Sequence, residues 1–334
     1  MTRPSVSAII VNWNHGHFLP GCLDALLGQD YSQLDITVVD NASQDGSPEL
    51  IAHTYSDVRL WTFPSNIGFS AALNWGLSHT EGDLVLSLNP DVIVTESFVA
   101  LLVEAIVHDD EIGIAAPKLL QAQNPALLDS TGLFIDLRRR PFDRGQGEPD
   151  IGQYDTRTTV FGACGAAALY RRTMLQDLVV DRECFDESFF AYYEDADLSW
   201  RAQLLGWRSV YAPRAVAIHD RGWGDTLRKR GRATKGTQGP RLALRNRYLM
   251  MAKNDSLTHF LCDLPLILAA EAPRLAYVAI TRPQTLLGLL DLIRGLPSAR
   301  AKRQQLRTRW RVDHTVIRHW FVAAPEAANR GDGT

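Results

Sequence analysis

The feature that most constrains this chain of 334 residues is an alternation of short apolar runs with amphipathic segments. The runs expected to form strands lie at 6–11, 36–39, 58–63, 84–88 and 112–116. Between the first two runs, an amphipathic helix is expected to place five apolar residues on one side: Leu19, Cys22, Leu23, Leu26 and Leu27. Strands that alternate with helices at this spacing predict right-handed crossovers. The chain is therefore expected to have an α/β fold with a mostly parallel sheet flanked by helices.

Polar side chains follow these runs where each strand would end. They are Asn12, Asp40, Asn66, Asn89 and Asp91. The carboxyl ends of parallel strands meet at one edge, where open α/β sheets bind their ligands. The two oxygen-bearing side chains around Pro90 could lean toward one hard cation, for which Mg²⁺ or Mn²⁺ is the natural candidate. Taken alone, however, Asn-Pro-Asp is also good turn chemistry, and the turn is then the favoured interpretation.

The loop after the first strand argues against a dinucleotide site. That site requires GxGxxG, whereas residues 11–16 read Val-Asn-Trp-Asn-His-Gly. A dinucleotide oxidoreductase is therefore disfavoured. Asp40 could instead accept hydrogen bonds from a nucleotide base or ribose, and a helix beginning near Ser70 could point its positive end toward a diphosphate. The alternative for each of these residues is a helix cap or turn former, and for Asp45 and Ser47 this alternative is as well supported as ligand contact.

Charge divides the chain into two unequal parts. Residues 1–220 hold 14 Lys/Arg against 30 Asp/Glu, and residues 221–334 hold 21 against 8. This asymmetry suggests an acidic body and a basic tail that meets an anionic surface. The four cysteines form no CxxC pair, which favours reduced thiols and a cytoplasmic location, and no signal peptide is expected.

Several motifs together resemble the inverting glycosyltransferases of family 2, and in particular the bacterial rhamnosyltransferases of cell-surface polysaccharide synthesis. The motifs are Val11-Asn12-Trp13-Asn14, residues 39–47, Asn66-Ile67-Gly68-Phe69, Leu88-Asn89-Pro90-Asp91, residues 161–166, residues 193–201 and His219. The similarity covers about residues 5–220 in order. It implies a GT-A-like nucleotide-diphospho-sugar transferase fold with a C-terminal helical extension.

The resemblance also implies roles for individual residues. Donor binding falls to Val11, Asn12, Asn14, Asp40, Asn41, Ser43, Asn66, Gly68, Phe69, Asn74 and Asn89. Metal binding falls to Asp91 and His219, although His219 could instead contact the diphosphate. The acceptor side falls to Gly162, Ala163, Cys164, Glu194 and Trp223, with tight core packing as an equal alternative for the small residues. Many relatives carry Asp-x-Asp where this chain has Asn89-Pro90-Asp91, so Asp91 is the safer metal ligand. For Asp195 the resemblance implies the role of catalytic base.

The chemistry explains why one such base is enough. Transfer with inversion needs a carboxylate that deprotonates the acceptor hydroxyl on the face opposite the leaving group. No second acid is required when a metal neutralises the departing diphosphate. Glu194-Asp195-Ala196-Asp197 places three acids where a helix begins. Acids are favourable in a first helical turn in any case, and this accounts well for Glu194 and Asp197.

The C-terminal part is expected to be a mobile basic loop at 223–240, helices over 241–324 and a disordered end at 325–334. Its uncharged runs fall short of the roughly 20 residues of a spanning helix, so no transmembrane segment is expected. Apolar helices over 259–296 are followed by a basic cluster of Arg294, Arg300, Lys302, Arg303, Arg307, Arg309, Arg311 and Arg318. Peripheral contact with anionic headgroups at the inner face of the plasma membrane would follow, and it should weaken with salt. Packing on the body or a homo-oligomer interface stays open.

The sequence thus predicts a metal-dependent inverting glycosyltransferase with a catalytic domain over residues 1–222. Its donor half would span about 1–117 and its acceptor half about 118–222. The resemblance alone implies dTDP-rhamnose as the favoured donor and a glycan or lipid-linked saccharide as the acceptor; no nucleic-acid partner is expected. Galactofuranose, glucose or N-acetylglucosamine as the sugar, and a non-catalytic sugar-nucleotide-binding relative, stay open as alternatives.

Overall fold

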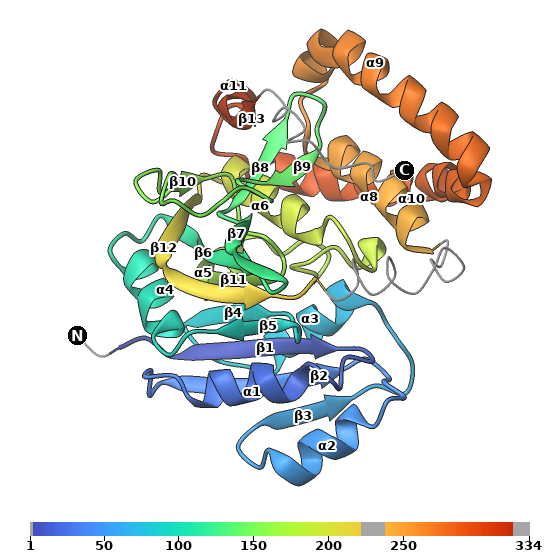
Figure 1. Ribbon diagram of the computed structural model, residues 1–334. Coiled ribbons are helices and arrows are strands. Elements are labelled where there is room, and N and C mark those ends of the chain that lie inside the picture. The colour runs from blue at the N-terminus through green and yellow to red at the C-terminus, as the bar shows by residue number, and fades with distance from the viewer. Residues whose placement is uncertain (1–2, 222–237, 323–334) are drawn as a thin grey trace.

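The computed structural model describes residues 3–221 and 238–322 and is built around a ten-stranded mixed sheet (Figure 1). The sheet order is β10-β12-β6-β11-β4-β1-β2-β3, with β5 added beside β12 and β7 beside β6. Helices flank the sheet, which confirms the predicted α/β class. Further helices from the C-terminal part gather at one end of the molecule, far from β3 (Figure 1).

The four strands of the N-terminal half are parallel, as predicted. They are β1 (Val6–Asn12), β2 (Leu34–Asp40), β3 (Arg59–Thr62) and β4 (Leu84–Leu88). Every residue of β1 and β4 is buried, because helices cover both faces of these central strands. Asn12 lies in register with Asp40, and Ile10 with Leu88. The carboxyl ends of β1, β2 and β4 therefore meet at one edge.

The second half of the sheet departs from the parallel pattern. The strand predicted at 112–116 is β6 (Ile112–Gln121), but β11 (Ala167–Arg171) runs antiparallel between it and β4. The long strand β12 (Arg208–His219) then pairs parallel with β6. Three short strands complete the sheet: β5 (Val92–Val94), β7 (Asn124–Ser130) and β10 (Thr159–Val160). Because β5 pairs antiparallel with β12, His219 lies opposite Val92, one residue from Asp91.

Two apolar cores lie on the two faces of the sheet. Against one face pack α1 (Leu19–Leu27), α2 (Ser47–Thr54) and α4 (Phe98–Val107). Against the other pack α3 (Phe69–Ser78), α5 (Arg172–Asp177) and α6 (Glu194–Leu204). The predicted apolar side of α1 is correct except for Leu27, which is 44% exposed.

The C-terminal helices extend the second of these cores. They are α8 (Gln238–Asn254), α9 (Leu257–Thr281), the 3-10 turn η2 (Pro283–Leu286), α10 (Leu287–Arg307), α11 (His314–Ile317) and the 3-10 turn η3 (Arg318–Trp320). Leu249 and Met250 of α8 and Ala299 of α10 belong to the same core as Trp200 of α6. A small sheet of β13 (Phe321–Val322), β8 (Leu133–Asp136) and β9 (Pro141–Asp143) closes this end. The helical extension therefore packs on the body.

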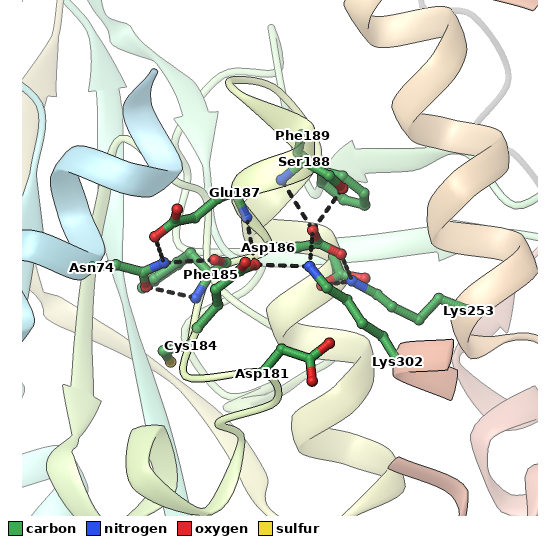
Figure 2. A network of polar contacts seen from close by, with 12 residues as sticks. Asn74, Asp181, Cys184, Phe185, Asp186, Glu187, Ser188, Phe189, Lys253 and Lys302 are labelled. Carbon is green, nitrogen blue, oxygen red and sulfur yellow. Dashed lines mark hydrogen bonds and ion pairs between the residues drawn. The ribbon is translucent and has the colours of Figure 1, made fainter. Parts of the chain in front are cut away.

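Buried ion pairs fasten α8 and α10 to the loop before α6. Figure 2 shows Lys253 and Lys302 reaching Asp186 from these two helices. Lys253 Nζ also lies 2.9 Å from Asp197 of α6, and Lys302 Nζ lies 2.7 Å from Glu183. All these side chains are buried except Glu183, which is partly exposed. The lysines therefore link the C-terminal helices to α6 and to the loop that precedes it.

This arrangement limits how much of the predicted basic cluster is available to an anionic surface. Lys302 is buried, Arg318 pairs with Asp263, and Arg309 and Arg311 both pair with Asp177. Arg303 donates to two backbone carbonyls of α8. Much of the predicted cluster thus binds the protein itself.

Helix α9 bears on the expectation that the chain has no transmembrane segment. With 25 residues and a mean hydropathy of 1.3 over an 18-residue stretch, it is long and apolar enough, by length and composition alone, to cross a membrane. Two of the charges that interrupt the apolar sequence of this helix, Asp263 and Glu271, are buried and paired. The apolar residues of α9 mostly point outward: Leu257, Leu261, Leu266, Leu268, Tyr277 and Ile280 are all exposed.

Candidate active site

Buried polar side chains tie together the carboxyl ends of β1 and β2. Asn12 Nδ2 donates to Asp40 Oδ1 at 2.7 Å, and also to the hydroxyls of Ser43 and Ser47. Asp40 Oδ2 accepts from the Ser43 N–H at 2.9 Å. Asn12 and Asp40 are both nearly fully buried. The structure therefore brings Asn12, Asp40 and Ser43 together, and their bonds fix the loop that follows β2.

Asparagines fix the neighbouring loops at the same edge. Asn14 adopts a φ of 56° and accepts from the Gln44 N–H, so it joins the loops that follow β1 and β2. Asn41 binds the 66–68 loop twice, accepting from Ile67 N–H and donating to the Gly68 carbonyl. Gly68 needs its lack of a side chain, because its φ is 93° and a Cβ would lie 2.6 Å from the Phe190 ring.

The remaining predicted donor residues are spread more widely. Val11 is buried within β1, Phe69 begins α3, and Asn89 lies partly buried just after β4. Asn66 accepts from the Gly68 N–H and so shapes its own loop. Asn74 is bonded at both amide atoms, donating to the Phe185 carbonyl and accepting from the Phe185 N–H (Figure 2). Its amide therefore clips α3 to the 185–187 segment.

Asp91 and His219, the predicted metal ligands, lie together. His219 Nε2 is 3.6 Å from Asp91 Oδ1, and both side chains are more than nine-tenths buried. His219 Nδ1 lies 2.8 Å from Asp129 Oδ2, which fixes the orientation of the ring. Burial alone would lower the pKa of His219, but hydrogen bonds to Asp129 and Asp91 raise it to about 9.

This donor set fits a hard divalent cation that binds a nucleotide diphosphate. Within residues 3–221 and 238–322, no group of three His, Cys, Asp or Glu side chains could hold a metal ion by itself. Magnesium typically uses one or two protein ligands and takes the others from water and substrate phosphates. A carboxylate beside a histidine whose second nitrogen meets another carboxylate is a recurring metal-site arrangement. Asp91 and His219 are thus the residues that would hold the ion.

Asp195 lies in the first turn of α6, where two backbone N–H groups hold its carboxylate. Gly165 N–H donates to Oδ2 at 2.8 Å and Ala196 N–H donates to Oδ1 at 2.7 Å. A Cβ at Gly165 would lie 3.1 Å from Oδ2, so a glycine suits this close approach. Burial, with a further contribution from the charge of Asp143, raises the pKa of Asp195 despite these two donors.

Glu194 and the small-residue segment lie around this carboxylate. Burial and the charge of Asp195 raise the pKa of Glu194. In the part of the chain that the structure describes, Glu194 Oε2 is buried without a hydrogen-bond partner. Gly162 packs so closely on α6 that a Cβ would lie 2.0 Å from Ser199 Oγ, and Ala163 is fully buried beside it. Burial raises the pKa of the Cys164 thiol well above its usual range. Trp223, predicted on the acceptor side, lies outside the described residues, as does most of the predicted 223–240 loop.

Three residues that the sequence did not single out connect the two halves of the site. Arg221 binds Asp129 through Nε and Asp143 through Nη2, the latter at 2.8 Å. Asp129 in turn binds His219, and the charge of Asp143 acts on Asp195. Paired side chains thus run from Asp91 to Asp143, and the charge of Asp143 acts on the predicted base. No local signal marks these partners, because 78 to 92 residues of sequence separate them.

Comparison with known proteins adds a family match. A family model described as "Glycosyl transferase family 2" matches residues 7–179. A Neorhizobium galegae protein named N-acetylglucosaminyltransferase is 28% identical over 246 residues, which are 70% of this chain and 55% of that protein. A Mycobacterium tuberculosis (strain ATCC 25618 / H37Rv) protein named N-acetylglucosaminyl-diphospho-decaprenol L-rhamnosyltransferase is 26% identical over 240 residues. These cover 63% of this chain and 74% of that protein. The match thus spans about half the length of the Neorhizobium relative.

Solved structures share the fold at low sequence identity. GalNAc-T7, solved with UDP, GalNAc and Mn²⁺, aligns with a TM-score of 0.57 and 15% identity over 75% of this chain and 48% of its own. TarS from S. aureus aligns with a TM-score of 0.56 and 16% identity over 91% of this chain and 52% of its own. At such identities the likeness shows the fold alone, and it confirms the GT-A-like architecture.

Proposed function

The chain belongs to glycosyl transferase family 2, so it is a glycosyltransferase that uses a nucleotide-sugar donor, and we propose that it inverts the transferred sugar with Asp195 as base. The observation that carries the proposal is the single polar array from Asp91 through His219, Asp129 and Arg221 to Asp143, whose charge raises the pKa of Asp195. In an inverting transfer, the base and the leaving diphosphate lie on opposite faces of the sugar. The array connects residues suited to bind the diphosphate with the residue suited to act as base.

Asp195 has the properties that this role needs. Its raised pKa makes it a stronger base than an exposed aspartate, and its two backbone donors hold the carboxylate in one orientation. Asp91 and His219 would hold a Mg²⁺ or Mn²⁺ ion, which when bound neutralises charge on the departing diphosphate. Asp40 and the asparagines of the neighbouring loops would contact the nucleoside, with Asp40 using carboxylate lone pairs beyond its two internal bonds.

The favoured donor is dTDP-rhamnose, and the favoured acceptor is a lipid-linked saccharide. Support comes from the sequence motifs and from the mycobacterial relative named a rhamnosyltransferase. The Neorhizobium relative, named for N-acetylglucosamine, favours the principal alternative. A donor panel of dTDP-rhamnose, UDP-N-acetylglucosamine, UDP-glucose and UDP-galactofuranose, assayed for hydrolysis with Mg²⁺ and with Mn²⁺, separates these sugars. Hydrolysis of UDP-N-acetylglucosamine but not of dTDP-rhamnose would reject the rhamnose assignment.

The base assignment has its own test. Asp195→Asn should lower turnover on the order of a hundredfold or more, while calorimetry finds donor affinity nearly unchanged, because the base acts only in the transition state. Asp35→Asn is the matched control, since Asp35 is an exposed aspartate of β2 paired with Arg59. Turnover near that of the wild type in the Asp195 variant would remove this residue from the role.

Helix α9 supports peripheral membrane contact. Its carboxylates are fixed inward by arginines, whereas its outer face exposes large apolar side chains, with Ile280 at 84% and Tyr277 at 66%. An exposed apolar face of this kind is typical of a membrane or protein contact. We propose that α9 lies in the plane of a lipid surface, because its inward-facing salt bridges would be lost if it spanned the bilayer.

The contact is testable by liposome flotation. Because the driving force is apolar and much of the basic cluster is paired internally, flotation should persist at high salt rather than weaken steeply. Replacing Leu268 and Ile280 by Glu should abolish it, whereas Leu50→Glu on the exposed part of α2 should not. Wild-type protein that stays at the bottom of the gradient would rule out the membrane contact.

A further inference from the structure

The segment that leads into the catalytic turn has an unusual backbone. Phe190, Tyr192 and Tyr193 all have positive φ, of 65°, 72° and 72°, although none is a glycine. Phe190 forms a three-residue turn, in which Ala191 N–H donates to the Phe189 carbonyl at 2.7 Å. Such conformations persist only where the surrounding structure holds them in place. Asp195 follows two residues after Tyr193, so whatever holds this segment also sets the position of the carboxylate.

One side chain of α8 provides much of that hold. Asn246 is fully buried, and its Nδ2 donates to the carbonyls of Phe189 at 2.9 Å, Ala191 at 2.8 Å and Tyr192 at 2.8 Å. Its Oδ1 accepts from Arg245 Nε at 2.9 Å, which fixes the amide orientation. A single amide therefore bonds the segment on both sides of Phe190.

The same segment touches the donor side of the site. The Phe190 carbonyl accepts from Ser70 N–H at 3.2 Å, and the Phe190 ring occupies the space above Gly68. Gly68 is bound in turn by Asn41, which follows directly after Asp40. Residues 189–193 therefore lie between the nucleotide-side loops and the first turn of α6.

We propose that Asn246 is a positioning residue for glycosyl transfer, which holds residues 189–193 so that Asp195 and the Gly68 loop keep a fixed relation. The inference rests on the proposed role of Asp195 as base. It makes α8 part of the catalytic unit, although no residue of α8 need touch the substrate. It also gives the C-terminal helices a function besides any contact with a membrane.

Asn246→Ala tests the proposal against Tyr248→Phe. Tyr248 lies on the same helix and gives a hydrogen bond of 2.7 Å to Glu271 of α9, not to a carbonyl of residues 189–193. Hydrogen exchange should speed up over 187–196 in the Asn246 variant only. Turnover should fall on the order of a hundredfold, as for a misplaced catalytic group, while Tyr248→Phe keeps near wild-type turnover.

A pH profile separates misplacement from a loss of folded enzyme. The groups around Asp195 are Glu194 on α6, Asp143 on β9, Tyr170 on β11, Cys164, and the Gly165 N–H. If the segment loosens, water reaches Asp195, so the acid limb of the rate profile should move to lower pH. A smaller folded fraction would scale the profile without moving it.

The outcomes are distinct. Near wild-type turnover in Asn246→Ala, or reduced turnover with an unmoved acid limb and unchanged exchange, overturns the proposal. Asp195→Asn is the reference in the same assay: if that variant retains turnover, the proposed function fails. If Asp195→Asn loses turnover while Asn246→Ala retains it, only the positioning role fails.

Discussion

Removing Lys253 tests whether the C-terminal helices fold as one unit with the catalytic body. The Lys253 side chain is 2% exposed, and its ammonium binds Asp186 and lies above the Phe189 ring, 4.8 Å from its centre (Figure 2). It also lies 2.9 Å from Asp197. Truncating one member of a buried ion pair typically costs about 3–5 kcal/mol, because the partner's charge stays buried. Here Asp186 keeps Lys302 and Asp197 keeps Arg201. We therefore expect Lys253→Met to cost about 3 kcal/mol, at the lower end of that range.

Urea unfolding at pH 7, followed by tryptophan fluorescence, measures this loss. Arg294→Met is the matched control on α10, because its side chain is 78% exposed and lies 3.5 Å from Asp291. An exposed pair of this kind should contribute below about 1 kcal/mol. An Lys253→Met midpoint equal to that of the control would refute the reasoning. So would a separate early transition in the wild-type protein, since α8 and α10 would then unfold apart from the body.

Three further predictions concern single carboxylates. Asp91→Ala should weaken nucleoside-diphosphate binding and its dependence on Mn²⁺ together, as calorimetry with and without the ion would measure. Asp40→Ala should weaken binding of the free nucleoside as much as binding of the full donor, which calorimetry with each ligand checks. The third prediction concerns Glu271. Burial alone would raise the pKa of Glu271, but hydrogen bonds from Arg140 and Tyr248 and the charge of Arg247 lower it from 4.5 to about 2. Its stabilising effect is thus complete above pH 4.5 and lost toward pH 2, so the stability deficit of Glu271→Gln in urea unfolding should shrink across that window.

The sequence predicted those parts of the site that local patterns encode. Buried runs located β1, β2 and β4, and the residues at their ends, Asn12, Asp40 and Asp91, lie at one edge as expected. The acids of 194–197 begin a helix, and Arg201 binds Asp197 as one turn of helix allows. Periodicity and turn chemistry suffice where a residue's position depends mainly on its neighbours in the chain.

The rest depends on contacts between distant segments. Asp129 and Asp143 follow no motif, and they join the site only because β7 and β9 fold back toward the end of β12. Strand β11 lies antiparallel between β4 and β6, and an alternation of strands and helices in the sequence does not predict this pairing. Asn246 likewise reads as an ordinary polar residue of α8 until its three carbonyl partners, 54 to 57 residues earlier, are seen.

The charge asymmetry of the sequence has its explanation inside the fold. The acidic N-terminal part and the basic C-terminal part led to the prediction of a basic tail that binds an anionic surface. The acidic body of the same molecule supplies part of that surface. Lys253 and Lys302 neutralise Asp186, while Arg309 and Arg311 neutralise Asp177. Opposite charges in two parts of one chain are thus what intramolecular docking requires, and they do not by themselves point to an external partner.

Ion pairs also form between basic residues of the N-terminal part and acidic residues of the C-terminal part, and these pairs explain the orientation of α9. The turn at 138–140, within the acidic part, presents arginines to the carboxylates of α9: Arg139 binds Asp263, and Arg140 binds Glu271. Buried carboxylates of a helix are stable only when paired, so these ion pairs fix which side of α9 faces the body. The apolar side is then left outside. The basic tail was the reason to expect membrane contact, but many of its charges form ion pairs within the molecule. The exposed apolar face of α9 is the feature that now supports membrane contact.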